Sequence, residues 1–184
     1  MEQALVIYES MFGNTRVVAE AITQGLSARF LTESVEVGAA PAWIPHEVSL
    51  VVVGGPTHAF GLSRARTRED AAKQAGTALV SPGIGLREWL SMLEGARRGI
   101  HAATFDTRID KPRVPGSAGR AAQKRLHRLG FDIVAGAESF YVTGTKGPLV
   151  PGEVERARLW GADLARRIPA VQPGAARAMR GTAA

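Results

Sequence analysis

Two short runs of the sequence are apolar at every position, a pattern that does not suit a strand with one face in water. Residues 4–8 read ALVIY, and residues 50–53 read LVVV. A strand in a half-exposed antiparallel sheet alternates apolar and polar residues, whereas a parallel strand covered by helices on both faces is apolar throughout. The two runs therefore predict central strands of a parallel sheet, and both are far too short to cross a bilayer.

Helical and strand patterns alternate along the rest of the chain. Apolar residues recur every fourth position at Val18, Ile22 and Leu26, which predicts a helix soon after the first strand. The two glycines and the proline at 54–56 are expected to end the strand that begins at Leu50. Further strands are expected at 34–37 and 100–105, and a last strand at 131–134 and 139–142, interrupted near Gly136. Helices are expected at 67–76 and 86–93, which would cover one sheet face, and at 152–168. Another helix is expected to begin after an N-cap at Ser117 and to end at Gly130. This alternation predicts an α/β fold with a doubly wound parallel sheet of about five strands.

Composition and charge narrow the class of protein. With 184 residues, 45% of them hydrophobic, the chain predicts one globular domain at 1–169, followed by a flexible basic tail at 170–184 that has no apolar stripe. The absence of cysteine excludes disulfides, thiolate metal sites and cysteine nucleophiles. No signal-peptide pattern precedes the first strand, so a cytoplasmic location is expected. A formal charge of +6 and a pI near 10.5 favour an acidic ligand or partner.

The loop between the first strand and the first helix has the composition of a phosphate site. It consists of Ser10, Met11, Phe12, Gly13, Asn14 and Thr15. In an open α/β sheet, ligands bind outside the carboxyl ends of the strands, where backbone N–H groups and the positive end of the helix dipole converge. Gly13 permits close approach, and Ser10, Asn14 and Thr15 add neutral hydrogen-bond donors. The alternative is that Gly13 and Asn14 only turn the chain and Thr15 only caps the helix.

This first loop resembles the Ser/Thr-x-Thr-Gly-x-Thr phosphate loop of the flavodoxin family. Its Ser-Met-aromatic-Gly-Asn-Thr form is similar to the variant in flavodiiron-type flavodoxin domains, with Phe12 in place of a hydroxyl residue, so that one hydrogen bond to the phosphate is missing. The resemblance extends from Ala4 to Ile168. It implies a flavodoxin-like fold with strand order 2-1-3-4-5 and helices on both faces, and FMN as the cofactor.

The segment after the third strand is the second place where the resemblance puts the flavin. It consists of Pro56, Thr57, His58, Ala59, Phe60 and Gly61. In the family this loop wraps the isoalloxazine ring, which implies that Phe60 stacks on the ring and that a backbone carbonyl near Gly61 faces flavin N5. His58 has two interpretations: it hydrogen-bonds its own loop at the rim of the site, or it contacts the pyrimidine edge and relays a proton.

The third segment, Phe105, Asp106, Thr107 and Arg108, is expected as a loop after the fourth strand. The resemblance places it near the N3–H and C2=O edge of the ring, where Asp106 or Thr107 would accept a hydrogen bond. Arg108 would stabilise negative charge near flavin N1 and raise the reduction potential; its alternative role is a surface ion pair with Asp106 or Asp110. Neither flavin segment has the Trp or Tyr that many electron-carrier flavodoxins stack on their flavin.

Basic residues are concentrated between positions 108 and 128. They are Arg108, Lys111, Arg113, Arg120, Lys124, Arg125 and Arg128, and Asp110 is the one acidic residue in that range. The run is either a solvated helix face or a docking site for an acidic redox partner or for NAD(P)H. The sequence has neither the P-loop NTPase motif nor a metal-ligand spacing among its histidines, and specific nucleic-acid binding is not expected.

The sequence therefore supports two hypotheses of different classes. The first is an FMN-binding flavodoxin-like protein in electron transfer, either a carrier or a small flavin reductase, which would place it among the oxidoreductases. The second is a non-redox module of the same fold that binds another phosphate-containing ligand or an acidic protein.

Overall fold

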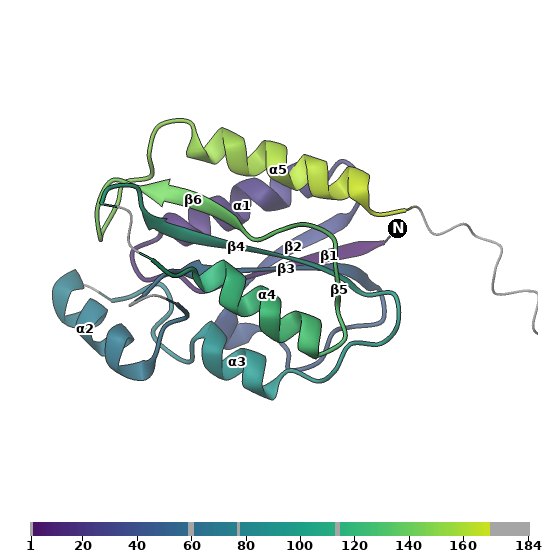
Figure 1. Cartoon of the computed structure of the whole chain (residues 1–184), viewed down its shortest axis with the longest axis horizontal. Coiled ribbons are helices and arrows are strands. Elements are labelled where there is room, and N and C mark those ends of the chain that lie inside the picture. Colours follow the sequence, from purple (N-terminus) through teal and green to yellow (C-terminus); the bar gives the residue numbers. More distant parts are fainter. Residues whose placement is uncertain (1, 59–60, 77, 113–114, 170–184) are drawn as a thin grey trace, which may run out of the picture.

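The computed structural model describes residues 2–58, 61–76, 78–112 and 115–169, and the expected basic tail at 170–184 lies outside these residues. Its helices and strands are β1 (Gln3–Tyr8), α1 (Asn14–Leu26), β2 (Leu31–Glu36), a short 3-10 helix (Val37–Ala39), β3 (Val48–Pro56), α2 (Ala65–Ala75), α3 (Leu86–Met92), β4 (His101–Ile109), α4 (Ala118–Arg128), β5 (Asp132–Ile133), β6 (Glu138–Val142) and α5 (Glu153–Arg167). The parallel sheet has the order β2-β1-β3-β4-β5, and β6 pairs with β4 (Figure 1). This arrangement confirms the predicted fold class, strand order and interruption of the last strand.

The two faces of the sheet carry separate apolar cores. Successive residues of a strand point to opposite faces, so in β1 the side chains of Ala4, Val6 and Tyr8 pack in the core under α1 and α5. Leu5 and Ile7 pack in the other core, under α3 and α4. Figure 1 shows these two helix pairs on opposite sides of the sheet. The prediction that residues 4–8 form a strand covered on both faces is therefore confirmed.

Strand β3 does not end at its glycines, contrary to the sequence expectation. Gly54 and Gly55 continue the ladder and pair with Phe105 and Asp106 of β4. A Cβ on Gly54 would lie 2.1 Å from the Phe105 ring, and a Cβ on Gly55 would lie 2.7 Å from the Leu86 side chain. The glycines are thus packing positions, because each leaves room for a large side chain of a neighbouring element.

Strand β4 is also longer than expected, because it has two successive partners on one edge. β5 pairs with its beginning, at His101 and Ala102, and β6 pairs with its end, from Phe105 to Ile109. The segment from Phe105 to Arg108 was expected to be a loop, and this expectation is wrong. The pairing with β6 holds these residues in extended backbone, which fixes where their side chains point.

Helix α2 does not cover the sheet, although the sequence analysis assigned it to the same face as α3. Ala71 is its one buried residue and belongs to neither apolar core. In Figure 1 the helix lies beside α3, beyond the end of the strands. Every apolar residue between Ala65 and Ala75 is alanine, which is too small to form a stripe that could hold a helix on the sheet. None of the described helices is long and apolar enough to cross a membrane.

Helices α1 and α5 approach each other so closely that backbone meets backbone. A Cβ on Gly161 would lie 2.4 Å from the carbonyl oxygen of Ile22, and a Cβ on Gly25 would lie 2.0 Å from the carbonyl oxygen of Arg158. Real Cβ atoms do not approach backbone this closely, so each position requires glycine. The contact closes one side of the sheet and fixes the helix whose first turn forms the site described below.

We expect Gly161→Ala to destabilise the protein by about 1 to 3 kcal/mol, because the added methyl group forces the two helices apart. The sign of the change in unfolding free energy distinguishes a close contact from free space, since alanine in a helix with free space around it stabilises by about 1 kcal/mol relative to glycine. Urea denaturation measures the free energy of unfolding. The control is Gly136→Ala, where a Cβ meets no atom within 4 Å. A stabilised Gly161→Ala protein would contradict the close contact.

Candidate functional site

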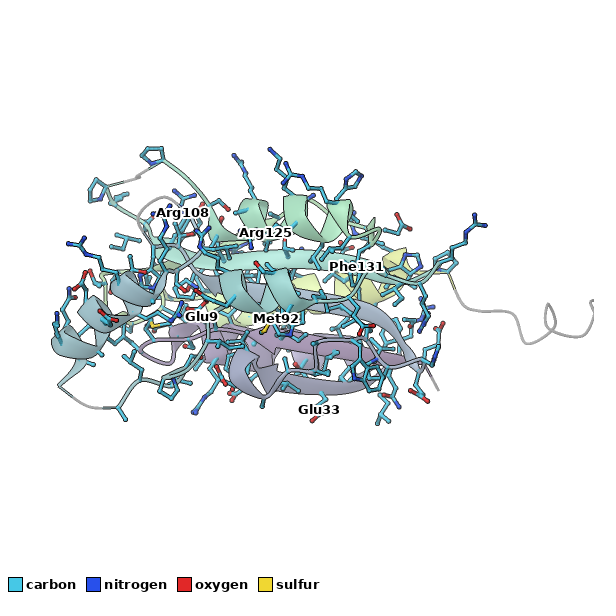
Figure 2. All side chains as sticks on the ribbon, turned by 90° about the horizontal axis from the view of Figure 1, so that it is seen from below. Glu9, Glu33, Met92, Arg108, Arg125 and Phe131 are labelled. Atoms are coloured by element: carbon cyan, nitrogen blue, oxygen red, sulfur yellow. The ribbon has the colours of Figure 1, made fainter. Side chains whose placement is uncertain are left out.

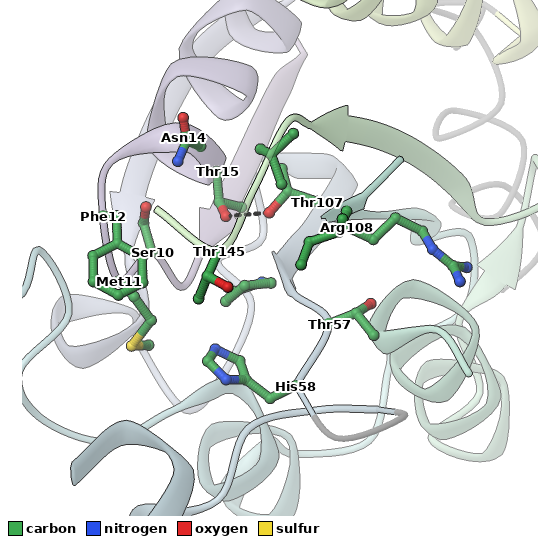
Figure 3. A pocket seen from close by; sticks show the side chains of 13 residues that line it. Ser10, Met11, Phe12, Asn14, Thr15, Thr57, His58, Thr107, Arg108 and Thr145 are labelled. Atoms are coloured by element: carbon green, nitrogen blue, oxygen red, sulfur yellow. Dashed lines mark hydrogen bonds between the residues drawn. The ribbon is translucent and has the colours of Figure 1, made fainter. Parts of the chain in front are cut away.

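The carboxyl ends of β1, β3, β4 and β6 surround one pocket (Figure 3). It contains about 500 Å³ of empty space, part of which is open to solvent. Its lining residues are Ser10, Met11, Phe12, Asn14, Thr15, Pro56, Thr57, His58, Thr107, Arg108, Ile109, Val142 and Thr145. The structure therefore brings together all three segments that the sequence analysis singled out. Among the described residues, no group of three histidine or carboxylate side chains could hold a metal ion.

The first turn of α1 faces this pocket, and its N-cap residue makes no side-chain cap bond. Gly13 is the N-cap residue and has a left-handed conformation, with φ of 92°, which favours glycine. The first N–H groups of any helix lack intrahelical partners, and α1 has no acidic residue in its first turn. The N–H of Arg16 is bonded to Ser10, and the other leading N–H groups and the helix dipole present partial positive charge to the pocket.

The polar side chains of the first loop are bonded within the protein. The hydroxyl of Ser10 accepts from the N–H groups of Gly13, at 3.1 Å, and Arg16, at 3.4 Å. The hydroxyls of Thr15 and Thr107 are 2.7 Å apart, which joins the first loop to β4 (Figure 3). The amide of Asn14 donates to the carbonyl of Lys146 at 3.0 Å. These bonds hold the loop in place, so the geometry of the loop does not depend on a ligand.

A second set of bonds fixes the wall made by β3 and β4. The carboxylate of Asp106 is fully buried and accepts from the hydroxyls of Thr57 and Ser117 and from the N–H of Gly119. The hydroxyl of Thr57 accepts in turn from the N–H of Ala118 at 3.0 Å. Ser117 caps α4, as the sequence predicted, because its hydroxyl accepts from the N–H of Arg120. Asp106 thus joins the pocket wall to the start of α4.

Two of the predicted flavin contacts have their side chains outside the pocket lining. The ring of Phe105 packs edge-on against Phe140 and Trp160 in the core under α1 and α5. The side chain of Asp106 lies in the bonds just described. Thr107 and Arg108, the next two residues toward the carboxyl end of β4, do line the pocket. The sequence analysis treated the four as one loop, and their position along the strand separates them.

His58 lies at the pocket wall, and its environment disfavours the charged form of the imidazole. Burial, and then the nearby charge of Arg68, lower its pKa below the ordinary value of 6.5. Its Nε2 is buried and has no hydrogen-bond partner among the described residues. Its backbone pairs with that of Gly61 in both directions at 2.8 Å, which makes a tight turn. Ala59 and Phe60, predicted to contact the flavin ring, lie outside the described residues.

Thr145, Val142 and Ile109 line the pocket and were missed by the sequence analysis. They come from the ends of β4 and β6 and from the loop that follows β6. The sequence carried a usable signal, because the polar and glycine-containing segment TGTKG follows the last strand directly. Since the carboxyl ends of all parallel strands meet at one edge, that loop had to join the others.

Glu9 is a further residue that the sequence analysis left without a role. It follows β1 directly, yet only 1% of it is exposed. Its carboxylate accepts from the hydroxyl of Ser63 and from the N–H of Leu86 at the start of α3. Burial raises its pKa, and the bonds to Ser63 and Leu86 and the charge of Arg68 offset part of this effect. Glu9 thus ties α3 and the segment before α2 to the end of β1.

Solved structures with this arrangement are similar to the chain over nearly all its length. Flavodoxin 1 of Bacillus cereus is 18% identical over 91% of this chain and 100% of that chain, with a TM-score of 0.62. The chain has a flavodoxin-like fold. The Streptococcus pneumoniae TIGR4 flavodoxin is 12% identical over 90% of this chain and 99% of that chain, with a TM-score of 0.60.

The flavodoxin-like fold also occurs within a larger protein. The Flv1 flavodiiron core of Synechocystis sp. PCC6803 is 15% identical, with a TM-score of 0.59, over 91% of this chain and 36% of that chain. No protein-family model matches the chain, and no curated protein matches it. The pocket lies at the carboxyl edge of the flavodoxin-like sheet, the edge where such folds bind their ligands.

Glu9 makes the stability of the protein depend on pH in a defined direction. A group whose pKa is raised by folding contributes stability below its ordinary pKa, which is 4.5 for this carboxyl, and loses it as the pH rises through the folded value. We therefore expect the unfolding free energy of the native protein to fall relative to that of Glu9→Gln as the pH rises from about 4 to about 8. Urea denaturation across this range measures the difference.

The matched control for this experiment is Glu88→Gln on α3. Burial would raise the pKa of Glu88, but bonds from backbone N–H groups and the charge of Arg68 outweigh burial and lower it. The unfolding free energy of the native protein relative to Glu88→Gln should therefore rise as the pH rises toward the ordinary pKa of 4.5, and should stay level above it. A difference between native protein and Glu9→Gln that does not change with pH would contradict the environment described for Glu9.

Proposed function

We propose that this protein binds FMN in the pocket and passes electrons through the flavin. The single observation that carries the proposal is the first turn of α1, which has Gly13 as its N-cap and no acidic residue, facing the pocket at the carboxyl edge of a flavodoxin-like sheet. The likeness to proteins named as flavodoxins supports the same function. When bound, the flavin would supply one- and two-electron redox chemistry, and the chain would bind and orient it.

The first loop fits a phosphate group. The leading N–H groups of α1 and its dipole favour an anion, and Gly13 leaves open space where any other residue would carry a side chain. Ser10 accepts two N–H bonds and still has its own hydroxyl proton to donate. In the Thr15 and Thr107 pair, one hydroxyl donates to the other, so one proton of the pair remains for a ligand. The site is thus rich in donors and free of carboxylates.

The rest of the pocket lining fits the planar ring of a flavin. Met11, Val142 and Ile109 give it apolar surface, and Thr57 and His58 give it polar groups. A neutral imidazole with an unpartnered buried nitrogen can donate to, or accept from, a ring edge without bringing charge. The guanidinium of Arg108 lies on the side of the pocket away from Ser10, where its charge would favour electron-rich states of a bound ring (Figure 3).

Gly13→Asp is expected to weaken FMN binding by at least about a hundredfold, because a carboxylate at the helix N-terminus occupies and repels the phosphate position. The fold should survive, since aspartate is a favoured N-cap residue and tolerates the left-handed conformation better than most residues. Flavin fluorescence quenching measures the dissociation constant. Gly13→Asn is the matched control, since it has the same shape without the charge, and it should bind FMN much more tightly than Gly13→Asp.

Three ligands separate this proposal from the non-redox alternative. Riboflavin lacks the phosphate, so Gly13→Asp and Gly13→Asn should bind it equally. Thermal shift with FMN should exceed that with inorganic phosphate, because the ring adds apolar contact. Stabilisation by phosphate but not by FMN would favour the alternative, in which the same helix terminus holds another phosphate-containing ligand. Failure of FMN to bind at all would overturn the proposal.

A further inference from the structure

Helices α3 and α4, together with the residue that precedes α2, carry a cluster of cations on the outside of the molecule. We call it the basic face and define it by Arg64, Arg87, Arg120, Lys124, Arg125 and Arg128. Positions 120, 124 and 128 are spaced by four, so they form one exposed stripe along α4. From Ala118 to Arg128 that helix has no acidic residue. Figure 2 looks onto this side of the molecule, with Arg125 labelled.

The cations of the basic face have no carboxylate partner among the described residues, whereas those of α5 do. On α5, Arg158 pairs with Glu155, and Arg166 and Arg167 pair with Asp163. No such ion pair involves any residue of the basic face. Unneutralised like charges on one surface repel each other, so the arrangement costs stability unless something outside the chain compensates it.

Backbone carbonyls hold two of these cations in fixed positions. Arg87 donates to the carbonyls of Leu62 and Ser63, and Arg125 donates to the carbonyl of Arg87 at 2.8 Å. Burial, followed by the charges of Arg125 and Arg64, lowers the pKa of Arg87, and the charges of Glu88 and Glu9 offset part of this effect. Side chains ordered in this way lose less entropy on binding than free ones.

The basic face borders the pocket. The N–H of Ala118, at the start of α4, is bonded to Thr57 in the pocket wall. Arg120 lies in the same first turn of that helix, and Arg64 follows Ser63 directly. A molecule docked across the stripe would therefore lie beside the opening of the pocket.

We propose that the basic face is a docking surface for an acidic protein. The partner would present carboxylates to the stripe on α4 and to the cluster around Arg87. The role of docking in electron transfer rests on the proposed function, because a protein docked at the basic face is placed to exchange electrons with a bound flavin. The docking itself depends on charge and shape at the basic face.

A protein suits this surface better than a nucleic acid does. Single-stranded nucleic acids are bound by exposed aromatic rings between the cations, and the one aromatic residue on α3 and α4, Trp89, is 1% exposed. Met92 is 53% exposed and follows Ser91, which contacts Arg125. Exposed methionine and arginine together are typical of protein interfaces.

The test measures binding of the protein to a plant-type [2Fe–2S] ferredoxin, chosen as an acidic folded probe, and to cytochrome c as a basic one. Fluorescence anisotropy at about 0.02 M and about 0.2 M salt should show binding to ferredoxin that weakens at the higher salt, and no comparable binding to cytochrome c. Arg120→Glu, Lys124→Glu and Arg128→Glu together should weaken ferredoxin binding by at least about tenfold. The corresponding glutamine variant should show a smaller loss in the same direction.

The matched control reverses Arg158, Arg166 and Arg167 to glutamate on α5, which changes the net charge by the same amount. This control should weaken ferredoxin binding by less than about threefold. An equal loss in both triple variants would overturn the proposal, because it would show an effect of net charge alone. A single-stranded oligonucleotide bound more tightly than ferredoxin, and lost on reversal of the α4 stripe, would also overturn it and indicate a nucleic-acid surface.

Failure of docking and failure of flavin binding can be told apart. Ferredoxin binding is measured on the protein without added flavin, and FMN affinity is titrated separately. Both triple variants should bind FMN as the native protein does, since no changed residue lines the pocket. Absence of ferredoxin binding by a native protein that binds FMN would contradict only the docking proposal for the basic face. Absence of FMN binding by a native protein that binds ferredoxin would contradict only the proposed function.

Discussion

The closeness of β3 and β4 to their neighbours is the constraint on which the rest of the structure depends. Gly54 and Gly55 have no side chain, so the ring of Phe105 and the side chain of Leu86 fill the space above and below them. The two strands can then continue in register as far as Pro56 and Thr107. Because they end level with each other, the polar residues that follow or end them meet at one edge of the sheet. A side chain at either glycine would push the strands or helices apart at the floor of the pocket.

Hydrogen bonds around the pocket hold the loops and strand ends that form the site in fixed positions. Asp106 connects Thr57 with the start of α4, and the hydroxyl pair of Thr15 and Thr107 connects the first loop with β4. Ser10 draws the N–H groups of Gly13 and Arg16 toward itself. Sites organised in this way lose little entropy when a ligand binds, since their donors are already in place. The chain thus uses most of its conspicuous loop residues for positioning and presents helix N–H groups and a few remaining hydroxyl protons to the ligand.

The sequence predicted the architecture well because its signals were strong and local. Fully apolar runs predicted the covered strands, four-residue periodicity predicted α1, and Ser117 predicted the start of α4. It failed where the outcome depended on distant partners. Glycines at 54–55 read locally as a strand end, but Phe105 and Leu86, far along the chain, make them part of the ladder. Residues 105–108 read as a loop because pairing with β6 cannot be seen from their own composition.

For the site, the sequence by itself determined which segments meet, since in a parallel sheet every loop at the carboxyl edge faces the same crevice. It also determined that the first turn of α1 carries a glycine and no acid, and hence favours an anion. Tertiary structure alone decided which side chains face the pocket. Phe105 and Asp106 are buried on opposite faces of the sheet, whereas Thr107 and Arg108 line the wall, because they lie nearer the carboxyl end of β4, where the pocket opens. It also decided that Thr145 joins the site, that Glu9 is buried, and that the cations of α3 and α4 gather without carboxylates, because each depends on elements brought together only by folding.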